Sequence, residues 1–395
     1  MSRWTAPLVA AGLVAFGALA AAEIASRMAA VHLVRAGELA AAVRLRPRDQ
    51  DMREAASLAQ LERGRPDAAI ASARWAILAA PLSPYGYRQF GLAEEARGRL
   101  PEADALLGAA HSLSRWDSRT ELWRMRRAFD QRRFDEASIS AAALMRIDHD
   151  YATLVASLVL GAGPAAEPAM VDRMIASPTW RGVFFRRIAA ADPGRAIALA
   201  EQLRERGAQL TLAEQRLAVR DVSSRRGPIA ARRLLAAMDP ASRAAVSDPE
   251  MRGVEGVPPF SWKLSSAGGG SAAFGATGDP SVPRALVLEA RGVVSRDRLA
   301  EQVIVLSPGR YRLTGEVLSR DGERLPFRWA VDCRGGRRLV AVAPVAGRGW
   351  TDFSAPFEVP ATCRVQVLAA SSLSPDGGGV SAAFRNLNIT PESGE

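Results

Sequence analysis

The sequence predicts a multidomain chain that is α-helical first and β-stranded last, with an N-terminal membrane helix, a helical solenoid and a C-terminal β-sandwich. Three observations indicate this fold class. An uncharged run follows Arg3, a Gly-Arg-acidic-Ala pattern returns every 34 residues, and short β-branched or alternating runs replace the helical pattern after residue 260. The expected parts are a signal anchor or signal peptide at 1–22, a helical repeat domain at 23–250, a linker at 251–259, a sandwich at 260–390 and a tail at 391–395.

The first part is the uncharged run from Trp4 to Ala22, which is 19 residues long. About 20 apolar residues cross a bilayer as a helix. Small residues at 18–20 and 20–22 also suit signal-peptidase cleavage, so a cleaved signal peptide and an uncleaved anchor both stay open. The helical pattern continues without a break through Glu23 and Met28, which favours the anchor. Either way the rest of the chain is expected to be exported.

The repeat domain is marked by three alanines, Ala69, Ala103 and Ala137, which lie 34 residues apart. A Gly-Arg turn precedes the first two, and a glycine there ends a helix in a left-handed cap at no steric cost. This period indicates stacked helix pairs. Over residues 35–150 the chain resembles the tetratricopeptide family, with Arg132 where the other units have glycine. A further 34-residue spacing, Ala196 to Ala230, predicts that degenerate units extend the array to residue 250.

Composition says little about the partner. The formal net charge is +10, but Lys263 is the only lysine and the other 51 basic residues are arginine. An Ala-, Gly- and Arg-rich chain of this kind is what a GC-rich coding bias produces, so nucleic-acid binding is not expected. The tetratricopeptide resemblance instead implies a protein partner on the concave face of the repeats.

The C-terminal part alternates as strands do, which predicts a jelly-roll sandwich of eight to nine strands. The expected strands are 284–290, 301–306, 310–318, 327–333, 338–345, 363–370 and 380–389, and the Gly runs at 268–270 and 377–379 are expected to be loops. The opening Phe260-Ser261-Trp262, the Pro308–Leu313 strand start, the Trp350–Phe353 segment and the closing Phe384–Ile389 strand resemble carbohydrate-binding modules of the family 4/9 type.

That resemblance implies aromatic rings stacked on sugars, whose C–H faces match a flat apolar ring. The candidates for glycan contact are Trp262, Trp329 and Trp350. The alternative is that these rings fill the sandwich core, which is what we expect for Tyr311 because it alternates with Leu313 in a strand.

Cys333 and Cys363 are the only cysteines, and both fall in the predicted sandwich. Export would place them in an oxidising compartment, where disulfides persist. One ends a predicted strand and the other begins one, so antiparallel neighbours or facing strands would bring them within bridging distance. A disulfide is therefore expected, with two buried thiols as the alternative.

The sequence contains no nucleophile elbow, phosphate-binding loop, dinucleotide fingerprint or metal motif. No catalytic residue, metal site or cofactor is expected, and the chain is predicted not to be an enzyme. The resulting hypothesis is a periplasmic scaffold, anchored by residues 4–22 in the inner membrane of a Gram-negative bacterium, that serves polysaccharide assembly or export. Its repeats would hold a protein and its sandwich would contact polysaccharide. The alternatives are an envelope protein-assembly scaffold without a glycan ligand, a glycan-modifying enzyme, and, after cleavage, a soluble periplasmic or secreted protein.

Overall fold

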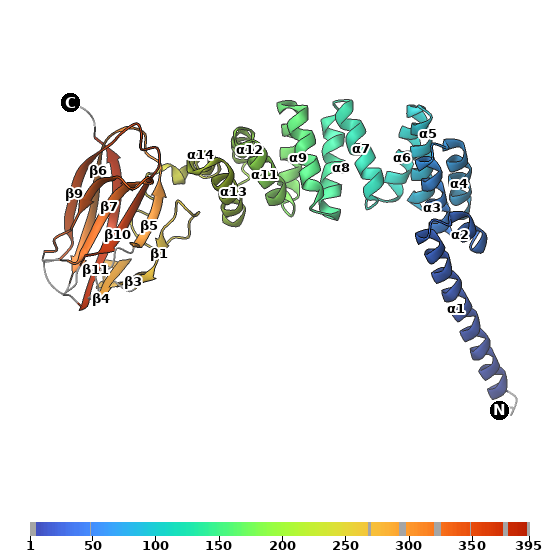
Figure 1. Cartoon of the computed structure of the whole chain (residues 1–395), viewed down its shortest axis with the longest axis horizontal. Coiled ribbons are helices and arrows are strands. Elements are labelled where there is room, and N and C mark those ends of the chain that lie inside the picture. The colour runs from blue at the N-terminus through green and yellow to red at the C-terminus, as the bar shows by residue number, and fades with distance from the viewer. Residues whose placement is uncertain are drawn as a thin grey trace. The chain divides into compact units, whose positions relative to one another are not determined.

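The structure, a computed structural model, describes residues 5–47, 49–267, 270–291, 298–319, 325–347, 349–373 and 378–392. Helices occupy the N-terminal part and two antiparallel sheets the C-terminal part (Figure 1), so the predicted fold class is confirmed. The chain forms two compact units, Met1–Tyr151 and Ala152–Glu395, and each is described by itself. The helical segment after Ala152 belongs to the same unit as the sandwich, and the predicted domain limits at 250 and 260 stay a prediction.

The first unit consists of helices joined by short connections. Its helices are α1 (Thr5–Arg35), α2 (Leu39–Leu45), α3 (Gln50–Glu62), α4 (Pro66–Ala79), α5 (Pro84–Ala96), α6 (Leu100–Leu113), α7 (Ser118–Asp130) and α8 (Phe134–Ile147). The helices α3, α5 and α7 start 34 residues apart, and so do α4, α6 and α8. A helical repeat array is therefore present, with the period that the sequence shows.

The turn inside each repeat has one backbone geometry. Gly64, Gly98 and Arg132 all lie in the left-handed region, with φ of 68°, 77° and 56°. The amide after each turn residue donates to the carbonyl oxygen five residues earlier, at 2.8–2.9 Å, which closes the helix end. The small position that follows is completely buried in all three repeats, at Ala69, Ala103 and Ala137. Arg132 thus adopts the conformation of the glycine that it replaces.

The helix α1 continues from the apolar N-terminal run into the array. Its C-terminal part packs through Ala30 against Ala42 and Met52, whereas Leu13, Phe16 and other apolar side chains before Glu23 are exposed. The segment Leu13–Arg35 is long and apolar enough to cross a membrane.

The second unit begins with six helices and two short 3-10 turns. They are α9 (Tyr151–Ala162), η1 (Pro164–Ala166), α10 (Glu167–Ala176), α11 (Arg181–Ala191), α12 (Pro193–Glu205), α13 (Leu212–Arg226), α14 (Pro228–Met238) and η2 (Pro240–Arg243). The predicted spacing of 34 is wrong here by one residue. Ala196 is completely buried, but its counterpart is Ala231, also completely buried, rather than the half-buried Ala230. Both buried alanines lie four residues after the N-cap of their helix.

The sandwich consists of two antiparallel sheets. The five-stranded sheet has the order β1 (Lys263–Leu264), β5 (Arg298–Ile304), β10 (Gln366–Ser372), β7 (Phe327–Cys333), β8 (Arg338–Val342). The six-stranded sheet has the order β2 (Ser266–Ala267), β3 (Gly270–Asp279), β4 (Val282–Arg291), β11 (Gly378–Pro391), β6 (Gly309–Ser319), β9 (Thr351–Val359). Their inner faces enclose one core, in which Trp329 and Phe384 form an edge-to-face pair with centroids 5.6 Å apart.

Each of the seven expected strands overlaps a strand of the structure, but two long strands, β3 and β9, were not expected. The strand β3 is built largely of glycine and alanine and lacks the β-branched signal. Gly270, Gly378 and Gly379 belong to strands and not to loops, whereas 268, 269 and 377 lie outside the described residues.

The stretch 251–259 contains no helix or strand, yet it is packed. Met251 is completely buried and joins the sandwich core, and the carbonyl oxygen of Pro259 accepts a hydrogen bond from the amide of Val303 at 3.0 Å. This stretch therefore forms one margin of the five-stranded sheet, next to the site described below.

Candidate functional site

The outer face of the five-stranded sheet is defined by strand alternation. Phe327, Trp329 and Val331 of β7 point into the core, so Arg328, Ala330 and Asp332 point outward. Pairing in register with β10 and β5 extends the outer face to a short list of side chains: Val367, Ala369, Ser371, Arg298, Glu301 and Val303. The central residues on this face, Ala330 and Ala369, have small side chains. The surface is therefore lower there than at the longer side chains on either side.

A cleft of about 640 Å³ opens on this face. Its apolar floor contains Val303 and Val367, and Pro258, Pro259 and Trp262 line one side. The turn after β7, with Arg334 and Gly336, lines another part, and Lys263, Arg298 and Glu301 provide charged groups. The cleft thus combines apolar surface with charged hydrogen-bonding groups.

A chain of ion pairs crosses the outer face from strand to strand. Lys263 Nζ lies 3.0 Å from Glu301 Oε1, and Arg298 Nη1 lies 3.1 Å from Glu301 Oε2. Arg298 also reaches Asp332 across β10, with Nη2 3.4 Å from Oδ2, and Arg338 Nε lies 2.9 Å from Asp332 Oδ1. Both acids therefore have two basic partners each.

The ion pairs affect the protonation of Glu301. Partial burial alone would raise the pKa of this carboxyl group, but hydrogen bonds from Lys263 and Arg298 outweigh it and hold the pKa below its ordinary value. Glu301 is accordingly a carboxylate at neutral pH that pairs with Lys263 and Arg298 and keeps further acceptor capacity.

The two sheets differ in charge. Among the described residues, the outer face of the five-stranded sheet carries four basic and two acidic side chains, with two more arginines in the β7–β8 turn: Lys263, Arg298, Arg328 and Arg338, then Glu301 and Asp332, then Arg334 and Arg337. The outer face of the six-stranded sheet, leaving aside Arg291, whose side chain is not described, carries three basic and four acidic ones: Arg310, Arg312 and Arg385, then Glu289, Glu316, Asp352 and Glu358. An overall arginine bias would enrich both faces alike, so the positive balance is specific to the face with the cleft.

The three candidate tryptophans do not come together. Trp329 is completely buried and belongs to the core, as the alternative interpretation of the sequence had it, and it is not available to a glycan. Trp262 is partly buried, lines the cleft and contacts Trp329 edge to face, with centroids 5.7 Å apart.

Trp350 immediately precedes β9, a strand of the other sheet. Its indole Nε1 donates to Asp279 Oδ2 at 2.9 Å, and the Arg385 guanidinium lies 4.3 Å from the ring centroid. One face of the ring is thus covered by Arg385. Tyr311 stacks on Phe357 with its hydroxyl donating to the Ser307 carbonyl oxygen at 2.9 Å, so its ring packs at the margin of the core.

Cys333 and Cys363 form a disulfide with Cα atoms 5.6 Å apart. Cys333 ends β7, opposite Gln366 in the first pair of β10. Cys363 lies three residues before β10 and not in it, so the predicted start of that strand is wrong. The disulfide therefore holds the C-terminal end of β7, and the turn that follows it places Arg334 in the lining of the cleft.

The ion-paired residues of the cleft were missed from the sequence. Lys263 stood out only as the single lysine. Arg298 and Glu301 are three residues apart on β5, and Lys263 and Asp332 join them only through the pairing of β1, β5, β10 and β7. Within the described ranges there is no group of three or more His, Cys, Asp or Glu side chains that could hold a metal ion.

No family model matches the chain, and no curated protein matches it. Solved structures do resemble part of it. A sugar-binding protein, described as putative, from Bacteroides thetaiotaomicron has 12% identity and a TM-score of 0.27, with 38% of this chain and 96% of that one covered. A family 4 carbohydrate-binding module has 14% identity and a TM-score of 0.30, with 37% and 99% covered. A family 61 module in complex with β-1,4-galactotriose has 15% identity and a TM-score of 0.27, with 38% and 99% covered. At these values the likenesses say nothing about what this chain binds.

Proposed function

We propose that this protein is a non-catalytic scaffold of the bacterial envelope, anchored in the inner membrane by α1 with its bulk in the periplasm. Its array is of the tetratricopeptide type and binds a protein partner, and its sandwich binds a polysaccharide that is being assembled or exported. The observation that supports the glycan role is the cleft on the five-stranded sheet, because it combines an apolar floor with charged groups held in place by ion pairs.

This combination suits a sugar. A pyranose presents C–H groups on its faces and hydroxyl groups at its edge, so it needs apolar contact and directional hydrogen bonds together. Val303, Val367 and Trp262 supply the apolar contact in the cleft, and Lys263 and Glu301 supply a donor and an acceptor.

The ligand that this face favours is an acidic polysaccharide. Glu301 and Asp332 are each neutralised by two cations, and Arg334 and Arg337 add positive charge in the adjoining turn. A face with a net positive charge attracts a polyanion and repels a polycation. Uronate carboxylates also give arginine the bidentate partner that its planar group prefers.

The same geometry favours binding over hydrolysis. A glycosidase needs one carboxyl group with a raised pKa as general acid. Hydrogen bonds hold the pKa of Glu301 below its ordinary value, and Asp332 contacts two arginines. Glu301 is thus suited to orient cations rather than to donate a proton, and Asp332 is held by its two arginines.

The test uses the full chain in detergent or nanodiscs and measures the affinity for polygalacturonate, alginate and hyaluronan. Fully methyl-esterified forms of the same polymers are the uncharged controls. We expect Arg334→Glu, which reverses a charge in the cleft, to weaken binding of at least one acidic polymer by roughly tenfold or more. Arg310→Glu makes the same change on the six-stranded sheet and should leave the affinity within roughly twofold.

The outcomes separate the parts of the proposal. Equal binding of charged and esterified polymers would retain a glycan ligand and reject the acidic class. Loss of binding in Trp350→Ala but not in Arg334→Glu would place the ligand on the other sheet. No binding of any polymer would leave a protein-assembly scaffold, and release of reducing sugars would make the chain an enzyme.

A further inference from the structure

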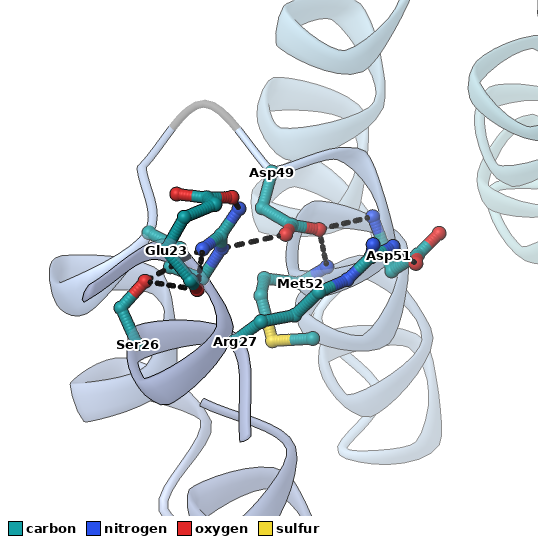
Figure 2. Close-up of polar contacts among 7 residues, drawn as sticks. Glu23, Ser26, Arg27, Asp49, Asp51 and Met52 are labelled. Carbon is teal, nitrogen blue, oxygen red and sulfur yellow. Dashed lines mark hydrogen bonds and ion pairs between the residues drawn. The ribbon is translucent and has the colours of Figure 1, made fainter. Parts of the chain in front are cut away.

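The helix α1 leaves the repeat array at one defined edge. Arg46, which follows α2, bonds to α1 through Nη1 to Ser26 Oγ at 2.7 Å and through an ion pair with Glu23 (Figure 2). Its Nε also lies 2.8 Å from Asp49 Oδ2, and Asp49 caps α3 by accepting from the amides of Asp51 and Met52. Arg46 therefore ties the α2–α3 connection to α1 at Glu23–Ser26, next to the C-terminal end of the uncharged run.

This edge is shared by later repeats. Because consecutive helices are joined by short connections, they run antiparallel, and the connections alternate between two edges of the array. We call the described residues of the connections between repeat units, 46–47 with 49, 80–83 and 114–117, the loop edge. The N-terminal run of α1 projects from the loop edge, because the opposite end of α1, at Arg35, turns into α2.

The loop edge carries large apolar side chains that nothing in the described chain covers. Leu82 is 83% exposed and Trp116 is 73% exposed. They lie 34 residues apart, at the same place in consecutive repeats, three residues beyond the ends of α4 and α6. Leu78 in the last turn of α4 is 82% exposed as well. Exposed apolar groups that recur on one edge indicate an interaction surface rather than scattered surface residues.

We propose that the loop edge lies on the surface of the bilayer that α1 enters, with Leu82 and Trp116 inserted at the boundary between headgroups and acyl chains. The occupant is lipid and not a protein, because α1 itself brings this edge next to the membrane at Glu23. Tryptophan prefers the interface, where its ring is apolar and its N–H stays wet, and leucine gains by leaving water. The proposal rests on α1 being the membrane anchor of the proposed function.

Such a contact would restrict the array. One helix alone permits tilting and rotation about the anchor, whereas the Arg46 contacts and two inserted side chains fix which edge faces the lipid. The opposite edge, with the left-handed turns at Gly64 and Gly98, would then face away from the bilayer.

The test places the full chain in phosphatidylethanolamine/phosphatidylglycerol vesicles with and without lipids brominated near the headgroup. Bromine quenches nearby indoles, so the measured quantity is the fractional loss of tryptophan emission. We expect Trp116→Phe to lower this loss, because an inserted indole is removed while an apolar ring remains. Trp123→Phe, in α7 of the same unit and away from the loop edge, should leave it unchanged. Trp4 is present in every variant, so its contribution to the quenching cancels when the variants are compared.

Alkaline extraction of the same vesicles shows whether the membrane anchor itself or only the contact of the loop edge with lipid is wrong. Release of the protein would reject the anchor and the edge contact together. Retention, with equal quenching in wild type and Trp116→Phe, would keep the anchor and reject the contact of the loop edge with lipid. Retention with reduced quenching only in Trp116→Phe supports both.

Discussion

Arg132 stands in a backbone conformation that suits glycine. Its φ of 56° matches the turns at Gly64 and Gly98, and its amide and the one after it make the same helix-ending hydrogen bonds. For a residue with a Cβ atom the left-handed region costs about 1–2 kcal/mol. The repeat therefore tolerates local strain in order to keep its period.

We predict that Arg132→Gly stabilises the array by about 0.5–1 kcal/mol, since relief of strain exceeds the extra chain entropy of glycine in the unfolded state. The urea midpoint of the helical signal in far-UV circular dichroism measures it. Gly98→Ala is the matched reversal and should lower that midpoint. A drop in Arg132→Gly would mean that the arginine side chain makes a contact worth more than the strain.

Glu301 should stabilise the sandwich only while it is ionised. Its pKa is lowered in the folded state, so its contribution is present above the ordinary glutamate value of about 4.3 and is lost as pH falls through the folded-state value. Because the network is partly exposed, we expect Glu301→Gln to cost at most about 1 kcal/mol at pH 7. Urea midpoints of the two proteins should converge on acidification, and a gap that does not narrow as pH falls below about 4.3 would contradict the ion-pair account.

At the residue scale, the sequence predicted the disulfide correctly, because the chain has only two cysteines and both fall in one predicted domain. Two cysteines in one predicted sandwich, together with the expected export, were enough to expect a bridge, and the structure joins them. Aromatic type alone did not separate surface from core, because Trp262, Trp329 and Trp350 lie at the cleft, in the core and under Arg385 respectively.

At the scale of elements, the repeat period was visible because small residues must recur wherever helices approach closely. Ala103 is completely buried at the start of α6, and Gly91 of α5 faces Leu107 so closely that an added Cβ atom would lie 2.6 Å from Leu107 Cγ. The spacing failed by one residue between α12 and α14. There the N-cap, and not the period, decides which alanine is buried.

We predict that Ala103→Leu destabilises the array by about 1–3 kcal/mol through overpacking. Ala105→Leu is the control, since residue 105 is exposed on the same helix and should change stability little. Thermal unfolding of the helical signal compares them. Equal melting temperatures for both variants would place Ala103 outside the packed interface.

Strands were predictable where β-branched residues alternate, as in β6 and β7, and not where glycine and alanine fill a strand, as in β3. Strand patterns of this kind do not predict which charged residues come together on the outer face of the five-stranded sheet. Arg298 and Glu301 are three residues apart on β5, but Asp332 is brought within reach of Arg298 only by the strand order β5-β10-β7, which is a property of the topology and not of any local sequence.

At the scale of the whole molecule, the chain joins an apolar helix, a repeat array and a glycan-binding candidate in one polypeptide. We predict that a reporter fused after residue 40 is active only if it is of the kind that works outside the cytoplasm, because Arg3 followed by an uncharged run is the pattern of a signal peptide or anchor. Activity of a reporter that works only in the cytoplasm would reverse the topology. The matched control is the same fusion with the run 8–19 deleted, which should retain both reporters inside.

Hydrogen–deuterium exchange of the full chain can show whether an acidic polysaccharide occupies the outer face of the five-stranded sheet. With an acidic polymer at saturation, we predict slower exchange in residues 258–263 and in the turn 333–337, which line the cleft. Exchange in the segment 349–353 around Trp350 should not change. Protection confined to that segment, or none at either place, would contradict the account.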